Sequence, residues 1–228
     1  MVNEKAAGRS ERRGMKADLA IPAGRLRPIS RVDIDQLENL LHEPDVRRFL
    51  CDDTCLPRKT IEDILETSSR LDCDGLGMWV IETRTQDFAG FVGLMPVGGT
   101  LADLPAMRGR IELTIAVRGR HWGQGIASSA LSAVVDHARD DLNVSELVAA
   151  VDTPNARSHH LLQTCGFRNI GTAPGPVHLL VLYRFSARQS EQASTHGTRS
   201  EPSRSLRDVT LPRQAETGVY WERSTKDE

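Results

Sequence analysis

One stretch decides how this 228-residue chain folds, and it reads Val117-Arg118-Gly119-Arg120-His121-Trp122-Gly123-Gln124-Gly125-Ile126-Ala127. Before it, residues 111–117 alternate between apolar and other side chains, as a strand does; after it, the apolar residues of 126–139 recur with the period of a helix. A glycine-rich turn between a strand and a helix suits an anion, because the first N–H groups of a helix are unpaired and its dipole attracts negative charge. Arg118 and Arg120 add positive charge. We therefore expect a phosphate-bearing ligand at this turn.

Two common nucleotide-binding loops do not fit the same residues. A Walker loop requires Lys and then Ser or Thr after its last glycine, and Ile126 and Ala127 occupy those positions. A Rossmann fingerprint requires a third glycine where Ser128 stands, and its ribose-binding acid closes the next strand, whereas Glu146 opens it. The turn therefore belongs to another class of phosphate site.

Outward from the turn, the order of elements predicts a mixed α/β sheet with helices on its faces. Apolar runs and alternation predict strands over residues 25–29, 78–83, 88–97, 111–117, 147–151 and 177–185. Helical spacing of apolar residues predicts helices after Ser30, over 60–71, over 126–139 and over 155–164.

The two ends of the chain differ in composition from this central region. Residues 1–24 are polar and charged, which predicts a flexible arm. Residues 187–228 are rich in Ser, Thr, Arg, Glu and Gln and cannot bury enough apolar surface to offset the entropy lost on ordering, so we expect a disordered tail. One domain over residues 25–186 is left to carry the function.

Bulk properties exclude several classes of protein. A net charge of −2 gives no overall attraction to nucleic acid or to an anionic membrane. No segment approaches the roughly 20 apolar residues of a membrane span, and the N-terminus lacks the apolar core of a secretory signal, so we expect a cytoplasmic protein. Cys51 and Cys55 lie four apart between His42 and Cys73, but no second tight pair completes a zinc site, and we expect no metal.

Three segments, in this order along the chain, resemble the GNAT acetyltransferase superfamily. The hairpin with Trp79-Val80-Ile81 and Gly90-Phe91-Val92-Gly93-Leu94 resembles its RimJ/RimL-like branch, and Arg120-x-x-Gly123-x-Gly125 resembles its acetyl-CoA pyrophosphate signature. Asn155-x-x-Ser158, followed by Gly166-Phe167, again resembles the branch. The resemblance covers about residues 26–185. It implies a mixed, mostly antiparallel sheet flanked by helices and splayed between two central strands, the predicted strands at 111–117 and 147–151, to admit CoA.

The resemblance also implies which residues bind acetyl-CoA. In this family the pantetheine arm pairs with backbone where the two strands splay, which implies Ile115, Ala116 and Val117. Backbone amides of the turn would hold the pyrophosphate with Arg120 beside them, and Asn155 would contact the cofactor from the last helix. The implied amide donors are Trp122, Gly123, Gln124, Gly125 and Ile126.

Acetyl transfer to an amine needs a base, because a lysine-type amine with a pKa of about 10.4 is mostly charged at neutral pH. Glu112 is the leading candidate, although a solvated strand carboxylate, or one paired with Arg110, is an equal alternative, and His121 is the competing base. Many relatives place a proton-donating tyrosine where Leu162 stands here. Ser158 inherits that role, with a first-turn hydroxyl as the plain alternative.

The sequence therefore predicts an N-acetyltransferase that uses acetyl-CoA as acyl donor and a primary amine as acceptor: a protein N-terminus, a polyamine or a small amine. The alternative is a non-catalytic acyl-CoA sensor or interaction domain of the same fold, favoured only by the missing tyrosine. We expect no membrane or nucleic-acid partner, and a monomer or homodimer.

Overall fold

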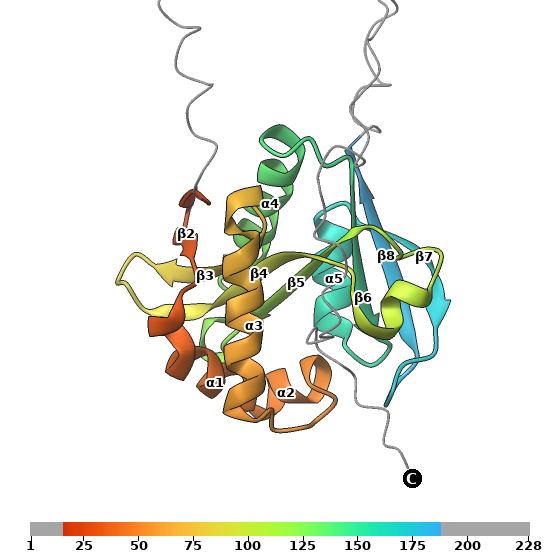
Figure 1. Ribbon diagram of the computed structural model, residues 1–228, viewed down its shortest axis with the longest axis horizontal. Helices are drawn as coiled ribbons and strands as arrows, with labels where there is room; N and C mark the ends of the chain where they lie inside the picture. Colours follow the sequence, from red (N-terminus) through yellow and green to blue (C-terminus); the bar gives the residue numbers. More distant parts are fainter. Residues whose placement is uncertain (1–15, 188–228) are drawn as a thin grey trace, which may run out of the picture.

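The computed structural model describes residues 16–187 (Figure 1). Most of the expected N-terminal arm and all but one residue of the expected tail lie outside these described residues. The strands within the described range are β1 Leu19–Ile21, β2 Gly24–Pro28, β3 Gly77–Thr83, β4 Phe88–Pro96, β5 Ile111–Val117, β6 Glu146–Asp152, β7 Arg168–Ala173 and β8 Leu180–Ser186. The helices are α1 Ile34–His42, α2 Pro44–Leu50, α3 Arg58–Leu71, α4 Ile126–Asp140 and α5 Ala156–Thr164.

All eight strands form one sheet in the order β1-β2-β3-β4-β5-β6-β8-β7. The first five strands pair antiparallel, each with the next one in the chain. β6 then joins β5 in parallel, and β8 pairs antiparallel with both β6 and β7. The expected α/β class, with a mixed and mostly antiparallel sheet, is confirmed.

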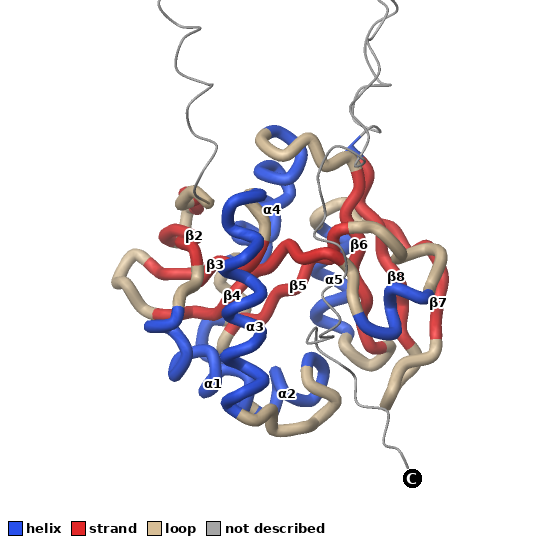
Figure 2. Tube along the Cα trace, in the orientation of Figure 1, coloured by secondary structure: helices blue, strands red, loops and turns tan. Residues whose placement is uncertain are grey.

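The helices fall into two groups that cover opposite faces of the sheet (Figures 1 and 2). α1, α2 and α3 contact one another and lie over β3 and β4 on the near side of the view, with α2 reaching β5. α4 and α5 contact each other, and α4 packs on β4 and β5. Apolar side chains from both groups and from the sheet form the main buried core.

Three elements differ from what the sequence predicts. β1 lies inside the segment expected to be a flexible arm, but its three residues pair with β2 and bury Ile21. α2 follows α1 directly, with Pro44 in its first turn and Val46, Phe49 and Leu50 at helical spacing. β7 is an edge strand whose residues are mostly exposed, so it lacks the apolar alternation that identifies a strand.

Lys16 fixes the start of the described chain to the sheet. Its ammonium donates to the Met78 carbonyl at 2.6 Å, pairs with Asp72 at 2.9 Å, and lies 4.2 Å from the ring centroid of Trp79. Burial lowers the pKa of Lys16 to about 8, although the contact with Asp72 acts in the opposite direction. The segment before β1 is therefore held by side-chain contacts.

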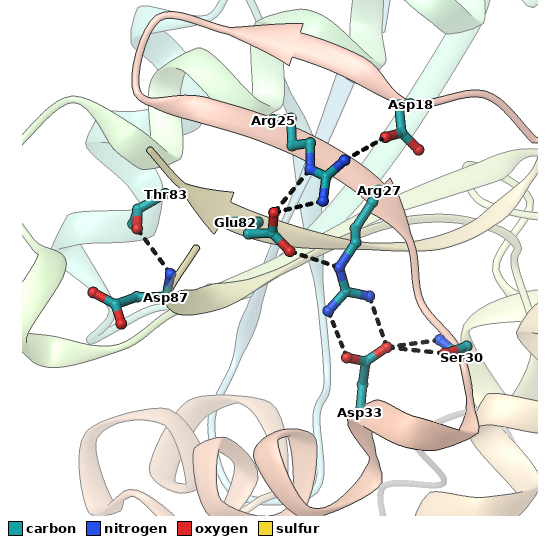
Figure 3. A network of polar contacts seen from close by, with 8 residues as sticks. All are labelled: Asp18, Arg25, Arg27, Ser30, Asp33, Glu82, Thr83 and Asp87. Carbon is teal, nitrogen blue, oxygen red and sulfur yellow. Dashed lines mark hydrogen bonds and ion pairs between the residues drawn. The ribbon is translucent and has the colours of Figure 1, made fainter. Parts of the chain in front are cut away.

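A charged network ties β2 to β3 and to the start of α1 (Figure 3). Arg27 donates to Glu82 at 2.8 Å and, with two nitrogens, to Asp33 at 2.6 and 2.9 Å. Arg25 donates to the other oxygen of Glu82 at 2.8 Å, while the N–H of Ser30 donates to Asp33. Each buried carboxylate in the network thus has more than one donor.

The sheet is weakest at the joint between β5 and β6. Only two residue pairs connect these strands, Ile111 with Leu147 and Glu112 with Val148. Beyond them, residues 113–117 and 149–152 diverge, while the outer edges of both strands stay paired with β4 and β8. The facing backbone edges are therefore open, which is the splay that the sequence implied.

Candidate active site

A cavity of about 660 Å³ passes through the sheet at this splay. Its walls come from both faces: α2 on one side, the start of α4 and α5 on the other, with β5 and β6 between them. The segment after β4, at residues 98–101, closes one flank. A ligand in this cavity can therefore reach from one face of the sheet to the other.

The turn before α4 presents backbone N–H groups at one mouth of the cavity. Gly123 and Gly125 have φ values of +74° and +72°, in the left-handed region that glycine enters without strain. Among the described residues, no backbone hydrogen bond uses the N–H of Gly123, Gln124 or Gly125. A Cβ at Gly123 would meet nothing within 4 Å, so space is open in front of the turn. These open donors and the α4 N-terminus suit a pyrophosphate.

Most of the residues expected to bind the cofactor line this cavity. The exceptions are Arg120 and Gln124, which are exposed and do not line it. The side-chain amide of Gln124 folds back and donates to the backbone carbonyl of Arg120 at 3.0 Å. The expected residues found in the lining are Ile115, Ala116, Val117, Trp122, Gly123, Gly125, Ile126 and Asn155.

The two arginines of the turn behave differently from each other. Arg118 donates to the backbone and side-chain oxygens of Gln36 at 3.1 and 2.9 Å and lies 3.8 Å from Glu43. It therefore ties the turn to the α1–α2 corner, so its charge is already engaged there. Arg120 donates to His121 Nε2 at 3.1 Å and is otherwise exposed. Of the two, Arg120 is the one placed to add positive charge at the mouth.

Trp122 links the turn to both the sheet and α5. Its indole N–H donates to the Val117 carbonyl at 2.7 Å, and the guanidinium of Arg157 lies 4.2 Å from its ring centroid. Arg157 also lines the cavity. Sequence reasoning missed Arg157, although it stands inside the Asn155-x-x-Ser158 segment and carries the charge that a phosphate site needs.

Glu112 and His121 both line the cavity but differ in environment. Glu112 is half-buried at the last pair before the strands diverge. Burial, followed by the nearby charge of Arg120, lowers the pKa of His121. Its Nε2 already accepts a hydrogen bond from Arg120. Glu112 is thus the better placed of the two for a proton acceptor inside the sheet.

The start of α5 brings Asn155 and Ser158 to the cavity wall. The Asn155 side-chain oxygen accepts from the Ser158 N–H at 3.2 Å and caps the helix. Ser158 is half-buried, and its hydroxyl belongs to the first turn of α5. Asn155 therefore has a structural task besides any contact with a ligand.

No tyrosine within residues 16–187 lines the cavity. Leu162, where relatives carry a tyrosine, is a buried lining residue. Tyr183 lies on β8 and its hydroxyl is 2.9 Å from His159 Nδ1, while His159 Nε2 is 3.1 Å from the Thr153 carbonyl. Since that carbonyl can only accept, Nε2 carries the proton and the Tyr183 hydroxyl donates to Nδ1. The Tyr183 hydroxyl is therefore already engaged in a hydrogen bond with His159 of α5.

Neither a metal site nor a membrane span is found in the described part of the chain. No group of three or more His, Cys, Asp or Glu residues among positions 16–187 is arranged to hold a metal ion. Burial raises the pKa of the Cys51 thiol to about 12, and Cys55 accepts a hydrogen bond from Arg47. No helix in the same range has the length and apolar character needed to cross a bilayer.

Comparison with known proteins identifies the family. The family model described as acetyltransferase (GNAT) domain matches residues 25–168. The uncharacterized N-acetyltransferase p20 of Bacillus licheniformis is 24% identical over 174 residues, which cover 74% of this chain and 94% of that protein. N-acetyltransferase 8B of Rattus norvegicus is 33% identical over 121 residues, which cover 52% of each chain.

Solved structures share the fold at low identity. An acetyltransferase of Agrobacterium tumefaciens superposes with a TM-score of 0.61 at 22% identity, over 74% of this chain and 94% of that one. Spermidine N-acetyltransferase of Vibrio cholerae, solved with CoA and spermine, gives a TM-score of 0.57 at 18% identity, over 71% and 94%. With the family match spanning the splayed sheet and the turn before α4, this chain belongs to the GNAT acetyltransferase family.

Proposed function

We propose that this chain transfers an acetyl group from acetyl-CoA to a primary amine. The observation that carries the proposal is the cavity through the sheet, with open N–H donors at one mouth and Glu112 inside it. The proposal includes the RimJ/RimL-like branch, a cytoplasmic location, and a monomeric or homodimeric state.

The donor half of the cavity fits a long ligand with a diphosphate. The N–H groups of residues 123–126 would bind the pyrophosphate, with Arg120 and Arg157 adding charge. The expected donor Trp122 is not open, because its backbone N–H already donates to the Gly119 carbonyl at 3.1 Å. The open edge of β5 at Ile115, Ala116 and Val117 would pair with the amides of the pantetheine arm, because its partner strand has diverged. Asn155 would contact the ligand from the α5 side.

Acetyl-CoA supplies a thioester whose carbonyl carbon an amine attacks while the sulfur leaves as a thiolate. Glu112 would accept the proton of the attacking amine, directly or through a water molecule. It stands where β5 and β6 last touch, so an acceptor coming from the α2 face meets a carboxylate at the gap. The N–H groups of Ile115 and Val117, which point away from β4, would also be available to an oxyanion.

Ser158 would return a proton to the departing sulfur. It is half-buried on the α5 side of the cavity, opposite the α2 face from which an acceptor would come. Its hydroxyl is a weak acid, so its role would be to position the proton rather than to lower the barrier by much. The solvent can supply the same proton.

The decisive test has two measurements on the whole chain. Calorimetry measures the affinity for CoA, and a thiol reagent measures CoA released from acetyl-CoA with a panel of primary amines. We expect micromolar-range CoA binding and amine-dependent release, with acetylated amine detected by mass. Tight CoA binding without turnover on any amine would instead identify a non-catalytic acyl-CoA sensor, the function that Leu162 in place of a tyrosine favours.

A further inference from the structure

We infer that the acceptor is a primary amine that carries an apolar group and only one positive charge. This inference rests on the proposed acetyl transfer, because it concerns the half of the same cavity that the acyl donor would leave free. That half lies on the α2 face of the sheet, away from the turn before α4.

Apolar side chains dominate this acceptor half. α2 contributes Val46, Phe49 and Leu50, which follow one another at helical spacing and all line the cavity. Met95 at the end of β4 and Leu101 in the following turn complete the wall. Phe49 and Leu50 are only half-buried, so a ligand group placed against them would cover apolar surface that now faces solvent.

The carboxylates that line the cavity are few for a polycation. The acidic residues that line the cavity, within the described chain, are Asp45, Glu112 and Asp152. Asp45 is exposed in the first turn of α2, and Asp152 is buried at the end of β6. Glu112 is the half-buried carboxylate of the acceptor half. A second ammonium group placed against Val46, Phe49 and Leu50 would lose water without gaining a charged partner, which is unfavourable.

Met95 and Glu112 determine how an acceptor would be oriented in the cavity. They are directly paired residues on β4 and β5, so their side chains emerge on the same face of the sheet. Met95 is almost completely buried. An amine at Glu112 would therefore have its nearest carbon atoms against Met95 and the rest of its chain against α2.

Two amines with the same six-carbon chain test this directly: hexylamine and 1,6-diaminohexane. They differ in whether the far end is a methyl group or a second ammonium. We expect kcat/KM for hexylamine to exceed that for the diamine by at least about tenfold, the discrimination that one group in an apolar pocket provides. Binding of each amine to the CoA-saturated protein, measured by calorimetry, should show the same preference.

Variants of Phe49 test whether α2 causes the preference for hexylamine over the diamine. Phe49→Ala should lower kcat/KM for hexylamine about tenfold or more, and Phe49→Glu should narrow or reverse the preference because it adds a second carboxylate to the wall. Val32→Ala removes an apolar side chain that is 85% exposed and does not line the cavity, so it should leave the preference unchanged.

The outcomes separate this inference from the proposed function. If the diamine binds and reacts as well as hexylamine, the acceptor class is wrong while acetyl transfer stands. If hexylamine binds the CoA complex preferentially but no acetyl product forms, the acceptor half is as inferred and the proposed function fails. If neither amine binds, or if Phe49→Glu leaves the preference unchanged, the inference is overturned.

Discussion

The β2–β3 network and the turn before α4 use the same polar groups in opposite ways. In the network, Arg27 meets Glu82 and Asp33, and every charge is matched by a partner a few ångströms away (Figure 3). In the turn, no backbone hydrogen bond among residues 16–187 uses the N–H groups of Gly123 and Gly125, and the exposed guanidinium of Arg120 donates to its neighbour His121. Groups that already have partners stabilise the fold, whereas groups without them keep the capacity to bind a ligand.

This contrast predicts that variants of the two regions fail differently. A change in the network should lower the free energy of unfolding and leave ligand binding intact. A change at the cavity should lower affinity or turnover and leave the fold intact. The variants below are ordered from the largest expected effect to the smallest.

Glu112→Gln should have the largest effect on turnover. It keeps the shape of the side chain but removes the proton acceptor, so kcat should fall by about 10²–10⁴-fold, the usual contribution of a general base. The CoA dissociation constant should change little, and the acidic limb of the pH–rate profile should change. Steady-state kinetics from pH 5 to 9 with calorimetry measure all three. Parent-like turnover across this range would make Glu112 a structural carboxylate.

Arg27→Met should lower the free energy of unfolding by about 2–4 kcal/mol, because it leaves Asp33 and Glu82 buried with fewer donors. Arg25→Met is the matched control: Arg25 contacts the same Glu82, but its side chain is 51% exposed, and the loss should stay below about 1 kcal/mol. Urea denaturation measures both variants. Equal losses would show that burial does not decide the strength of these contacts.

The same network sets a pH dependence. Burial alone would raise the pKa of Asp33 and of Glu82, but hydrogen bonds from the two arginines and Ser30 outweigh it and hold both values below their ordinary 3.8 and 4.5. Since these pKa values are lower in the folded state, their stabilising contribution is present above the ordinary values and is lost as pH falls through the folded ones. The urea concentration at the midpoint of denaturation should therefore decrease when the pH is lowered below about 4. The decrease should be smaller in Arg27→Met.

Gly123→Val should raise the CoA dissociation constant by at least about tenfold while the protein stays folded. Valine resists the positive φ of this residue by roughly 1–3 kcal/mol, so the turn should rearrange and withdraw its N–H groups. Gly109→Val is the control, because Gly109 has a φ of +69°, a Cβ added there would meet nothing within 4 Å, and the residue does not line the cavity. Unchanged CoA affinity in folded Gly123→Val would remove the turn from the binding site.

Ser158→Ala should have the smallest effect, below about tenfold in kcat. A thiolate whose conjugate acid has a pKa near 8.5 takes a proton from water without much help. The variant keeps the backbone N–H that Asn155 caps, so the start of α5 should be undisturbed. A loss as large as that of Glu112→Gln would instead make Ser158 a principal proton donor.

The sequence predicts most of the sheet because the side chains of its strands either alternate between apolar and polar or are continuously apolar. It predicts α4 and its turn because a glycine-rich stretch is followed directly by apolar residues at helical spacing. It misses α2 because the helical spacing of Val46, Phe49 and Leu50 covers little more than one turn of a seven-residue helix. It misses β1 and β7 because neither buries a full face: β1 has three residues, and β7 is an exposed edge. Such elements depend on pairing with distant strands, which a local pattern does not contain.

The site follows the same rule. The turn and the start of α5 are each contiguous in sequence, so their members could be named from the chain alone. Phe49 and Leu101 could not be identified as cavity residues, because the fold assembles that wall from segments about 50 residues apart. Arg157 could have been named, because it stands in the first turn of α5 beside Asn155 and Ser158. Arg118 shows the reverse error: its charge suggested a phosphate contact, but the α1–α2 corner lies close enough to engage it.

The order of the strands also determines how the protein assembles. β1 to β5 each pair with the next strand in the chain. The β1–β2 and β3–β4 hairpins need only contacts between close neighbours, the kind that form fastest, whereas α1, α2 and α3 separate β2 from β3. β6 must wait for α4, because a parallel partner requires a crossover. During synthesis from the N-terminus, β5 is therefore for a time the exposed edge of a five-stranded antiparallel sheet. Unpaired edges invite pairing with other chains, and the strand that opens to admit a ligand is also the one most exposed to aggregation until β6 arrives.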